Sequence, residues 1–261
     1  MPGNAVRMEI AGETNVGMKR THNEDNFAII AEENLVIVAD GMGGHASGEV
    51  ASKMAVDAMR EFFEATAKDP DATWPYKMDK QRSYEENRLV TGVKLANLRI
   101  FEGAQREPRY RGMGTTIVVC LAVREGLIVG HVGDSRVYRI RKGAIELLTE
   151  DHSLLNDYLK MRKLTEEEIA NFPHKNVIVR ALGMKEIVKV DSKLDQPQPG
   201  DIYLLCSDGL SGPVTDPDLL RIVEENKADL KVAASRLIAR ANENGGPDNI
   251  TCALIRWLGP G

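Results

Sequence analysis

The sequence predicts an α+β fold in which antiparallel sheets are covered by helices. Short runs rich in β-branched and apolar residues recur, and tight turns such as Glu125-Gly126 and Lys142-Gly143 favour hairpins over βαβ crossovers. Helical patterns lie between the groups of strands. The length of 261 residues, with 43% hydrophobic and 28% charged residues, allows a substantial core and argues against disorder. We expect residues 1–261 to form a single domain.

The expected strands are short runs with a high β-propensity. They comprise residues 6–11, 27–31, 35–39, 115–123, 127–132, 137–140, 202–206 and 251–257.

Four helical patterns accompany these strands. Over residues 49–63, apolar side chains recur every three or four positions and give one buried stripe. A second pattern covers residues 84–104, and a third begins at Thr165, which forms a capping box with Glu168. The last pattern covers residues 228–244 and stops at a Gly-Gly-Pro sequence. The polar, proline-containing residues 67–81 predict a surface connection.

Charge and cysteine content limit the function and the location. A net charge of -5 and a pI near 5.7, without a dense Lys/Arg block, argue against nucleic acid as a partner. The sequence has neither a signal-peptide pattern nor an apolar run of roughly 20 residues, so we expect no membrane segment and a cytoplasmic location. Cys120, Cys206 and Cys252 lie in apolar runs without metal-site spacing, which predicts buried, reduced thiols.

Aspartate recurs where strands begin or end. Asp40 and Asp208 each follow an apolar strand and open an Asp-Gly pair, Asp134 follows another strand, and Asp25 and Asp248 precede strands. A single Asp-Gly pair is weak evidence for a site, because Asp and Gly are the residues that turns prefer. Five such carboxylates can converge at one rim, where they repel one another unless cations lie between them. Oxygen ligands without His or Cys select Mg²⁺ or Mn²⁺ over zinc.

Eight motifs, in order and spread over nearly the whole chain, resemble the metal-dependent protein phosphatases of type 2C, bacterial branch. This resemblance implies a four-layer α-β-β-α sandwich of two stacked antiparallel sheets flanked by helix pairs. The motifs are RTHNED (20–25), VADGMGGHASGEVAS (38–52), GTT (114–116), GHVGDSRVYRIR (130–141), LTEDHSL (148–154), RALG (180–183), SDGL (207–210) and GGPDNIT (245–251).

The resemblance also implies a binuclear Mn²⁺ or Mg²⁺ centre at one edge of the sandwich. By position, Asp40 bridges both ions and the Gly41 carbonyl binds one of them, while Asp208 and Asp248 complete the other. Asp134, together with Asp208, is expected to hold a weaker third ion.

Further residues are implied to support the reaction. Glu24, Asp25 and Asn249 are expected to act through waters or from behind the direct ligands. Arg20 is expected to hold the substrate phosphate, because its planar guanidinium donates two parallel hydrogen bonds. Two cations roughly 3.5–4 Å apart activate a water for in-line attack on phosphorus, and no covalent phosphoenzyme is required.

The sequence departs from the family pattern at two positions. Met42 stands where the eukaryotic branch has a histidine thought to act as general acid, so a metal-bound water is our preferred proton source. His45 is nearby, although a histidine in a Gly-rich turn more often caps a turn or is solvated. His131 and His152 are interpreted as structural. Gly212 stands where an aspartate usually supports the third ion, so we expect that ion to bind weakly.

The family's variable flap corresponds to residues 151–179, and we expect it to shape substrate choice. The three acidic residues between positions 150 and 157 are interpreted as a solvated loop face rather than as ligands. The expected substrates are proteins phosphorylated on serine or threonine, including a bacterial serine/threonine kinase. A monomer is favoured.

Two other functions remain open at this stage. A pseudophosphatase that binds partners keeps the fold without catalysis, but the presence of Arg20, Asp40, Asp208 and Asp248 argues against it. A two-metal nuclease or phosphodiesterase uses the same chemistry. The acidic charge and the lack of a basic groove disfavour it.

Overall fold

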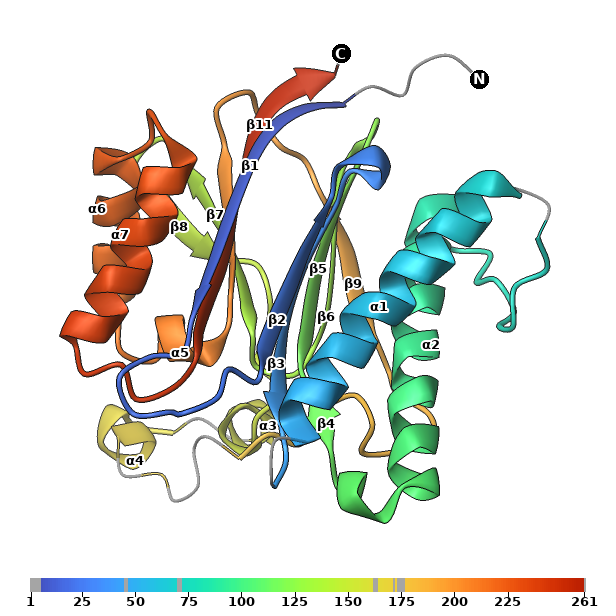
Figure 1. The fold of residues 1–261 in the computed structure, drawn as a ribbon. Coiled ribbons are helices and arrows are strands. Elements are labelled where there is room, and N and C mark those ends of the chain that lie inside the picture. Colours follow the sequence, from blue (N-terminus) through green and yellow to red (C-terminus); the bar gives the residue numbers. More distant parts are fainter. Residues whose placement is uncertain are drawn as a thin grey trace.

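Two antiparallel sheets lie at the centre of the molecule, and helices cover the outer face of each sheet (Figure 1). The computed structural model describes residues 6–44, 47–69, 72–161, 164–170, 172 and 177–260. The arrangement confirms the predicted α+β class and the four-layer α-β-β-α sandwich.

Each sheet is built from segments that are distant in the sequence. The first sheet has the order β1 (Val6–Asn15), β11 (Ile250–Pro260), β10 (Ile202–Cys206), β7 (Arg136–Arg141) and β8 (Ala144–Leu147). The second has the order β2 (Asp25–Ile30), β3 (Leu35–Met42), β5 (Ile117–Val123), β6 (Gly126–Val132) and β9 (Asp191–Asp195), with the short β4 (Gly114–Thr115) paired to the end of β3.

The helices are arranged in pairs outside these sheets (Figure 1). α1 (Ser47–Lys68) and α2 (Tyr84–Arg106) cover the second sheet, and α6 (Asp216–Glu225) and α7 (Leu230–Glu243) cover the first. The short α5 (Asp208–Ser211) follows β10 directly. The flap contains α3 (Leu154–Met161) and α4 (Glu166–Ala170). Two 3₁₀ turns, Ala31–Glu33 and Pro108–Tyr110, complete the described helical elements.

The hydrophobic core has three parts, one between the sheets and one under each helix pair. Strand β10 shows why: Leu204 and Cys206 face the helices, whereas Tyr203 and Leu205 face the other sheet. Because side chains alternate along a strand, a strand that is apolar at every position buries both of its faces. Such strands fix the positions of the polar residues that follow them at the edge of the sandwich.

Several local predictions are confirmed. The Thr165 hydroxyl accepts a hydrogen bond from the Glu168 N–H at 3.2 Å, and the Glu168 carboxylate accepts one from the Thr165 N–H at 2.8 Å. Lys142 and Gly143 have φ values of 50° and 77°, as the two-residue hairpin turn requires. Within residues 67–81, the first two still belong to α1, and the described residues after them connect α1 to α2. All three cysteines are buried and free.

Strands β8 and β9 and helix α6 were not predicted from the sequence. None of the described helices is long and apolar enough to cross a membrane.

Candidate active site

The predicted aspartates come together at one edge of the sandwich, and both sheets contribute to the cluster. Asp25 begins β2 and pairs in register with Asp40 near the end of β3. Asp208 lies two residues after β10, as the first residue of α5, and Asp248 lies two residues before β11, which is the neighbour of β10 in the same sheet. Asp134 follows β6 and is close enough to Asp40 to repel its charge. These five carboxyl groups form what we call the rim cluster.

Mutual repulsion and burial disfavour full ionisation of the rim cluster. Asp40 has some solvent exposure, but burial together with Asp25 and Asp208 raises its pKa well above the usual range. Burial raises the pKa of Asp25 to about 6 and, together with the charge of Asp208, that of Asp134 to about 7. Burial and the charge of Asp248 also raise the pKa of Asp208. Cations bound among these groups would relieve the repulsion.

The donor set of the rim cluster fits hard divalent cations. Among the described residues, Oδ1 of Asp25 and Oδ1 of Asp134 are buried without a hydrogen-bond partner. An unpartnered buried carboxylate oxygen is costly unless a ligand satisfies it. Oxygen ligands of this kind suit Mn²⁺ or Mg²⁺.

Asp40 is held by Thr115, the last residue of β4, and by Thr116, which follows it. The Asp40 carbonyl accepts hydrogen bonds from the Thr116 N–H and the Thr115 hydroxyl, both at 2.8 Å. The Asp40 N–H donates to Oγ1 of Thr116 at 3.2 Å. Gly41 follows in β3, and a side chain there would clash with the main chain of Gly48. The Gly41 position therefore requires glycine.

Asn249 fixes the N-terminal part of the site. Its Oδ1 accepts a hydrogen bond from the Glu24 N–H at 2.8 Å. Its Nδ2 donates to the carbonyls of Val16 and His22 at 2.9 and 2.8 Å. The amide thus joins the loop that carries Arg20 to the start of β11.

Arg20 lies at the open side of the rim cluster. Its Nη2 donates to Oδ2 of Asp248 at 2.7 Å, and its side chain is 47% exposed. An exposed guanidinium beside a proposed metal ligand is accessible to a phosphate. Glu24 lies beside the same loop, with Oε1 close to Gly48.

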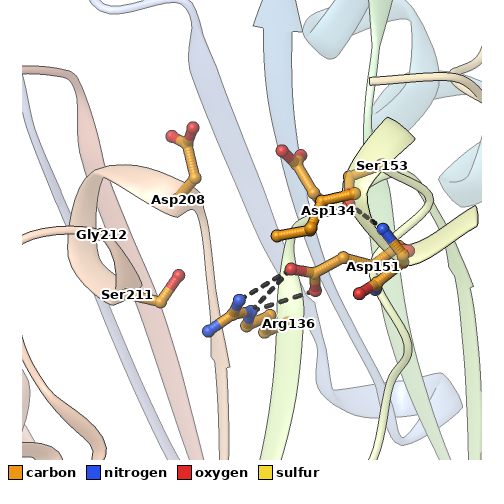
Figure 2. Close-up of a pocket in the computed structure, with 9 residues that line it drawn as sticks. Asp134, Arg136, Asp151, Ser153, Asp208, Ser211 and Gly212 are labelled. Atoms are coloured by element: carbon orange, nitrogen blue, oxygen red, sulfur yellow. Dashed lines mark hydrogen bonds and ion pairs between the residues drawn. The ribbon is translucent and has the colours of Figure 1, made fainter. Parts of the chain in front are cut away.

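A polar cavity of about 340 Å³ adjoins the rim cluster (Figure 2). Asp134 and Asp208 line opposite sides of it, and Gly212 and Ser211 continue the Asp208 side. Asp151, at the start of the flap, forms an ion pair with Arg136 at 2.7 Å. The other lining residues are Ser153, Leu155 and Asn156.

The structure corrects our interpretation of Asp151 as part of a solvated face. Its side chain is only 15% exposed and accepts hydrogen bonds from both Nε and Nη2 of Arg136.

Met42 pairs with Gly114 at the end of β3, as expected for a residue beside the rim. His45 lies outside the described residues. His131 and His152 are buried, in agreement with a structural role.

Comparison with known proteins settles the family. The sequence profile described as "Protein phosphatase 2C" matches residues 18–259, nearly the whole chain. The chain belongs to the protein phosphatase 2C family. The phosphatase is 37% identical over 249 residues to "Serine/threonine phosphatase stp" of Listeria innocua, with 93% of each protein covered.

Solved structures support the same assignment. The serine/threonine phosphatase PstP/Ppp of Mycobacterium tuberculosis has a TM-score of 0.82 and 32% identity, covering 96% of this chain and 99% of that one. A PstP catalytic domain in complex with two manganese ions has a TM-score of 0.77 and 32% identity, covering 96% and 98%.

These similarities confirm the predicted family, fold and enzyme class. The chain is a metal-dependent serine/threonine protein phosphatase, and its substrates are phosphorylated proteins. The expectation of Mn²⁺ or Mg²⁺ agrees with the manganese ions bound by the PstP relative.

Proposed function

We propose that the rim cluster holds two divalent cations and thereby hydrolyses phosphoserine and phosphothreonine monoesters. In this proposal Asp40, the Gly41 carbonyl, Asp208 and Asp248 would hold the ions. The observation that carries the proposal is the raised pKa of Asp40, caused by burial and by four neighbouring carboxylates. Such a concentration of negative charge is stabilised by cations.

Each residue around these ligands has a task that its contacts support. When bound, the ions lower the pKa of a water and stabilise charge on the phosphate oxygens. Arg20 binds and orients the phosphate from the open side, next to Asp248. Thr116 holds Asp40, and Asn249 holds Glu24 and the Arg20 loop. Asp25 supports the ligands from behind, where it accepts a hydrogen bond from the Ser207 hydroxyl at 2.8 Å.

We also propose that Asp134 and Asp208 bind a weak third cation, since Gly212 supplies no carboxylate on its side of the cavity. Residues 1–261 then act as one catalytic domain, with residues 151–179 as a flap beside this cavity. Three free, buried thiols suit a cytoplasmic location.

The physiological substrates are proposed to include a bacterial serine/threonine kinase. The net charge of -5 disfavours nucleic acid as a substrate. A pseudophosphatase is a weaker alternative, because a binding module has no need of five converging carboxylates whose pKa values are raised by their proximity.

The experiment that tests this proposal compares a phosphothreonine peptide, a chromogenic phosphate monoester and a matched diester, each with Mn²⁺ and with chelator. We expect hydrolysis of the peptide and the monoester with Mn²⁺ only, and little hydrolysis of the diester. Preferred cleavage of the diester would support a phosphodiesterase instead. Absence of all hydrolysis in a folded, Mn²⁺-loaded protein would support the pseudophosphatase.

A further inference from the structure

A second group of titratable side chains lies at the base of the flap. The ligand-type atoms of His131, His152 and Asp191 all lie within 4.8 Å of one another. The two imidazole rings stack with their centroids 4.7 Å apart and an angle of 17° between the planes. His131 pairs with Asp191 in the ladder between β6 and β9. His152 immediately precedes Ser153, which bridges to Ile178 at the far end of the flap and is followed by α3.

The contacts of this group argue against a metal ion. Nδ1 of His152 accepts a hydrogen bond from the Gly133 N–H at 3.0 Å, so this nitrogen carries no proton. Burial and the neighbouring His131 lower the pKa of His152 to about 4, which leaves the ring neutral at pH 7 with its proton on Nε2. Nε2 therefore donates to Oδ2 of Asp191 at 3.0 Å. Nη1 of Arg180 lies 2.9 Å from the same Nε2, but both atoms are donors, so Arg180 interacts with the Asp191 carboxylate instead. Both ring nitrogens are in use.

Asp191 is surrounded by donors rather than by other ligands. Nη1 of Arg180 lies 3.2 Å from its Oδ2, and Nζ of Lys189 lies 3.5 Å from its Oδ1. Burial opposes ionisation of Asp191, but the hydrogen bond from His152 and the charge of Arg180 lower its pKa to about 2. A carboxylate that is already neutralised by two cations has little affinity for a third.

The main chain of His152 joins the two ends of the flap. Its carbonyl accepts a hydrogen bond from the Val179 N–H at 2.9 Å. One residue further on, Ser153 forms a β-bridge with Ile178, and the Leu154 N–H donates to the Val177 carbonyl at 2.9 Å. The segment between these residues therefore leaves and returns at the same point of the sandwich.

His152 also holds both polar atoms of Gly133. The ring accepts from the Gly133 N–H, and the His152 N–H donates to the Gly133 carbonyl at 2.9 Å. Gly133 has φ of +110°, and a Cβ there would lie 2.6 Å from Cβ of Thr116. Asp134 comes next, and Ser135 shares a hydrogen bond of 2.6 Å with Thr116, which holds Asp40. The loop of Asp134 is thus fixed on both sides.

We propose that His152 is a positioning residue that couples the two ends of the flap to the Asp134 loop, with Asp191 accepting a hydrogen bond from its ring and Arg180 paired with Asp191. The cavity of Figure 2 is lined by Asp134, which follows Gly133, and by the flap residues Ser153 and Asn156, which follow His152 in the sequence. Recognition of a protein substrate at the flap therefore depends on the His152 ring. This proposal deepens the phosphatase assignment and rests on it for the role of Asp134.

Two amide variants separate the two contacts of the ring. In His152→Asn the amide oxygen replaces Nδ1 and still accepts from Gly133, but the donor to Asp191 is lost. In His152→Gln the amide nitrogen replaces Nε2 and still donates to Asp191, but the acceptor for Gly133 is lost. Asp191→Asn removes the charge and keeps the shape. We expect amide hydrogen exchange of metal-free protein to rise roughly three- to tenfold, the range expected for one hydrogen bond.

If His152 had only a general structural role, exchange would rise over the whole chain. The positions at which exchange becomes faster are therefore the informative readout. His152→Gln should accelerate Gly133, whereas His152→Asn and Asp191→Asn should accelerate Leu154 and Val179. The latter two variants should raise KM for a phosphopeptide about three- to tenfold while kcat/KM for a small chromogenic ester stays within about twofold. Asp57→Asn, an exposed α1 residue paired with Lys53, serves as the control.

Uniformly faster exchange over the whole chain, unchanged exchange in all three variants, or parallel losses on peptide and small ester would overturn the proposal. Exchange is measured without metal, so a wrong assignment of the metal ligands would leave this pattern intact. The two failures can therefore be told apart.

Discussion

Asp25→Asn should make the metal-free phosphatase more stable at neutral pH, although it removes a residue of the active site. Asp25 is 5% exposed, and its Oδ2 accepts a hydrogen bond from Ser207. Burial and repulsion by Asp208 and Asp248 raise its pKa from 3.8 to about 6. Asparagine keeps an oxygen for Ser207 and removes the charge, and its amide nitrogen can donate to the neighbouring carboxylates.

The pKa of Asp25 sets the size and the sign of the expected change in stability. A pKa raised from 3.8 to about 6 corresponds to about 3 kcal/mol, at about 1.4 kcal/mol per factor of ten. The folded protein holds this proton more tightly than the unfolded chain, so metal-free stability falls as pH rises from about 4 to about 6 and stays low above that. Asp25→Asn should therefore add up to about 3 kcal/mol at pH 7.5, or roughly 5 °C in Tm.

The assay is urea and thermal unfolding of chelator-treated protein at pH 5 and pH 7.5. The gain should be smaller at pH 5, where Asp25 in the natural protein is largely protonated. The control Asp57→Asn changes an exposed carboxylate and should shift stability by less than about 0.5 kcal/mol at both pH values. Adding Mn²⁺ should stabilise the natural protein more than Asp25→Asn. Equal gains at both pH values, or none at pH 7.5, would refute the argument from charge repulsion.

Substitutions at two further positions, Arg20 and Gly212, test the phosphate and third-metal assignments. Arg20→Ala should raise KM and lower kcat/KM roughly 10- to 100-fold, as expected for lost hydrogen bonds to a charged group. Arg20→Lys should retain only part of the natural kcat/KM, because lysine lacks the planar fork. Unchanged kinetics for Arg20→Ala would place Arg20 outside the site. Gly212→Asp should add a cation ligand beside Asp208 and lower the Mn²⁺ concentration needed for activity. Circular dichroism must confirm the fold, since a Cβ at Gly212 would lie 2.8 Å from the Asp208 carbonyl; a folded variant with unchanged Mn²⁺ dependence and no added binding would contradict the idea.

The sequence predicted the elements whose patterns are strong and local. Strand β10 is buried at every position and is followed by Ser-Asp-Gly, so both the strand and Asp208 were evident. Strand β9, with the sequence DSKLD, lies at a sheet edge and has no buried residue. Its polar composition therefore gave no strand signal in the sequence. Helix α6 begins with a Thr215 cap and Pro217, a signal that was available in the sequence.

Contacts between distant segments could not be predicted from the same patterns. Asp151 looked like a loop acid, and its pairing with Arg136 depends on how the flap folds back against β7. Asn249 could be assigned to the site from its motif. Its bonds to Glu24 and His22, more than 200 residues earlier, follow only from the pairing of β1 with β11.

The central claim is that Asp40 holds cations on which hydrolysis depends, and counting bound Mn²⁺ alongside turnover tests it most directly. Mn²⁺ binding by titration calorimetry and hydrolysis of a phosphothreonine peptide are measured on the natural protein and on Asp40→Asn. The account predicts two tightly bound ions in the natural protein, as in the manganese complex of its relative PstP. Asp40→Asn should lose at least one ion, and turnover should fall by several orders of magnitude. Full turnover by Asp40→Asn or by metal-free natural protein, with binding unchanged in the variant, would contradict it.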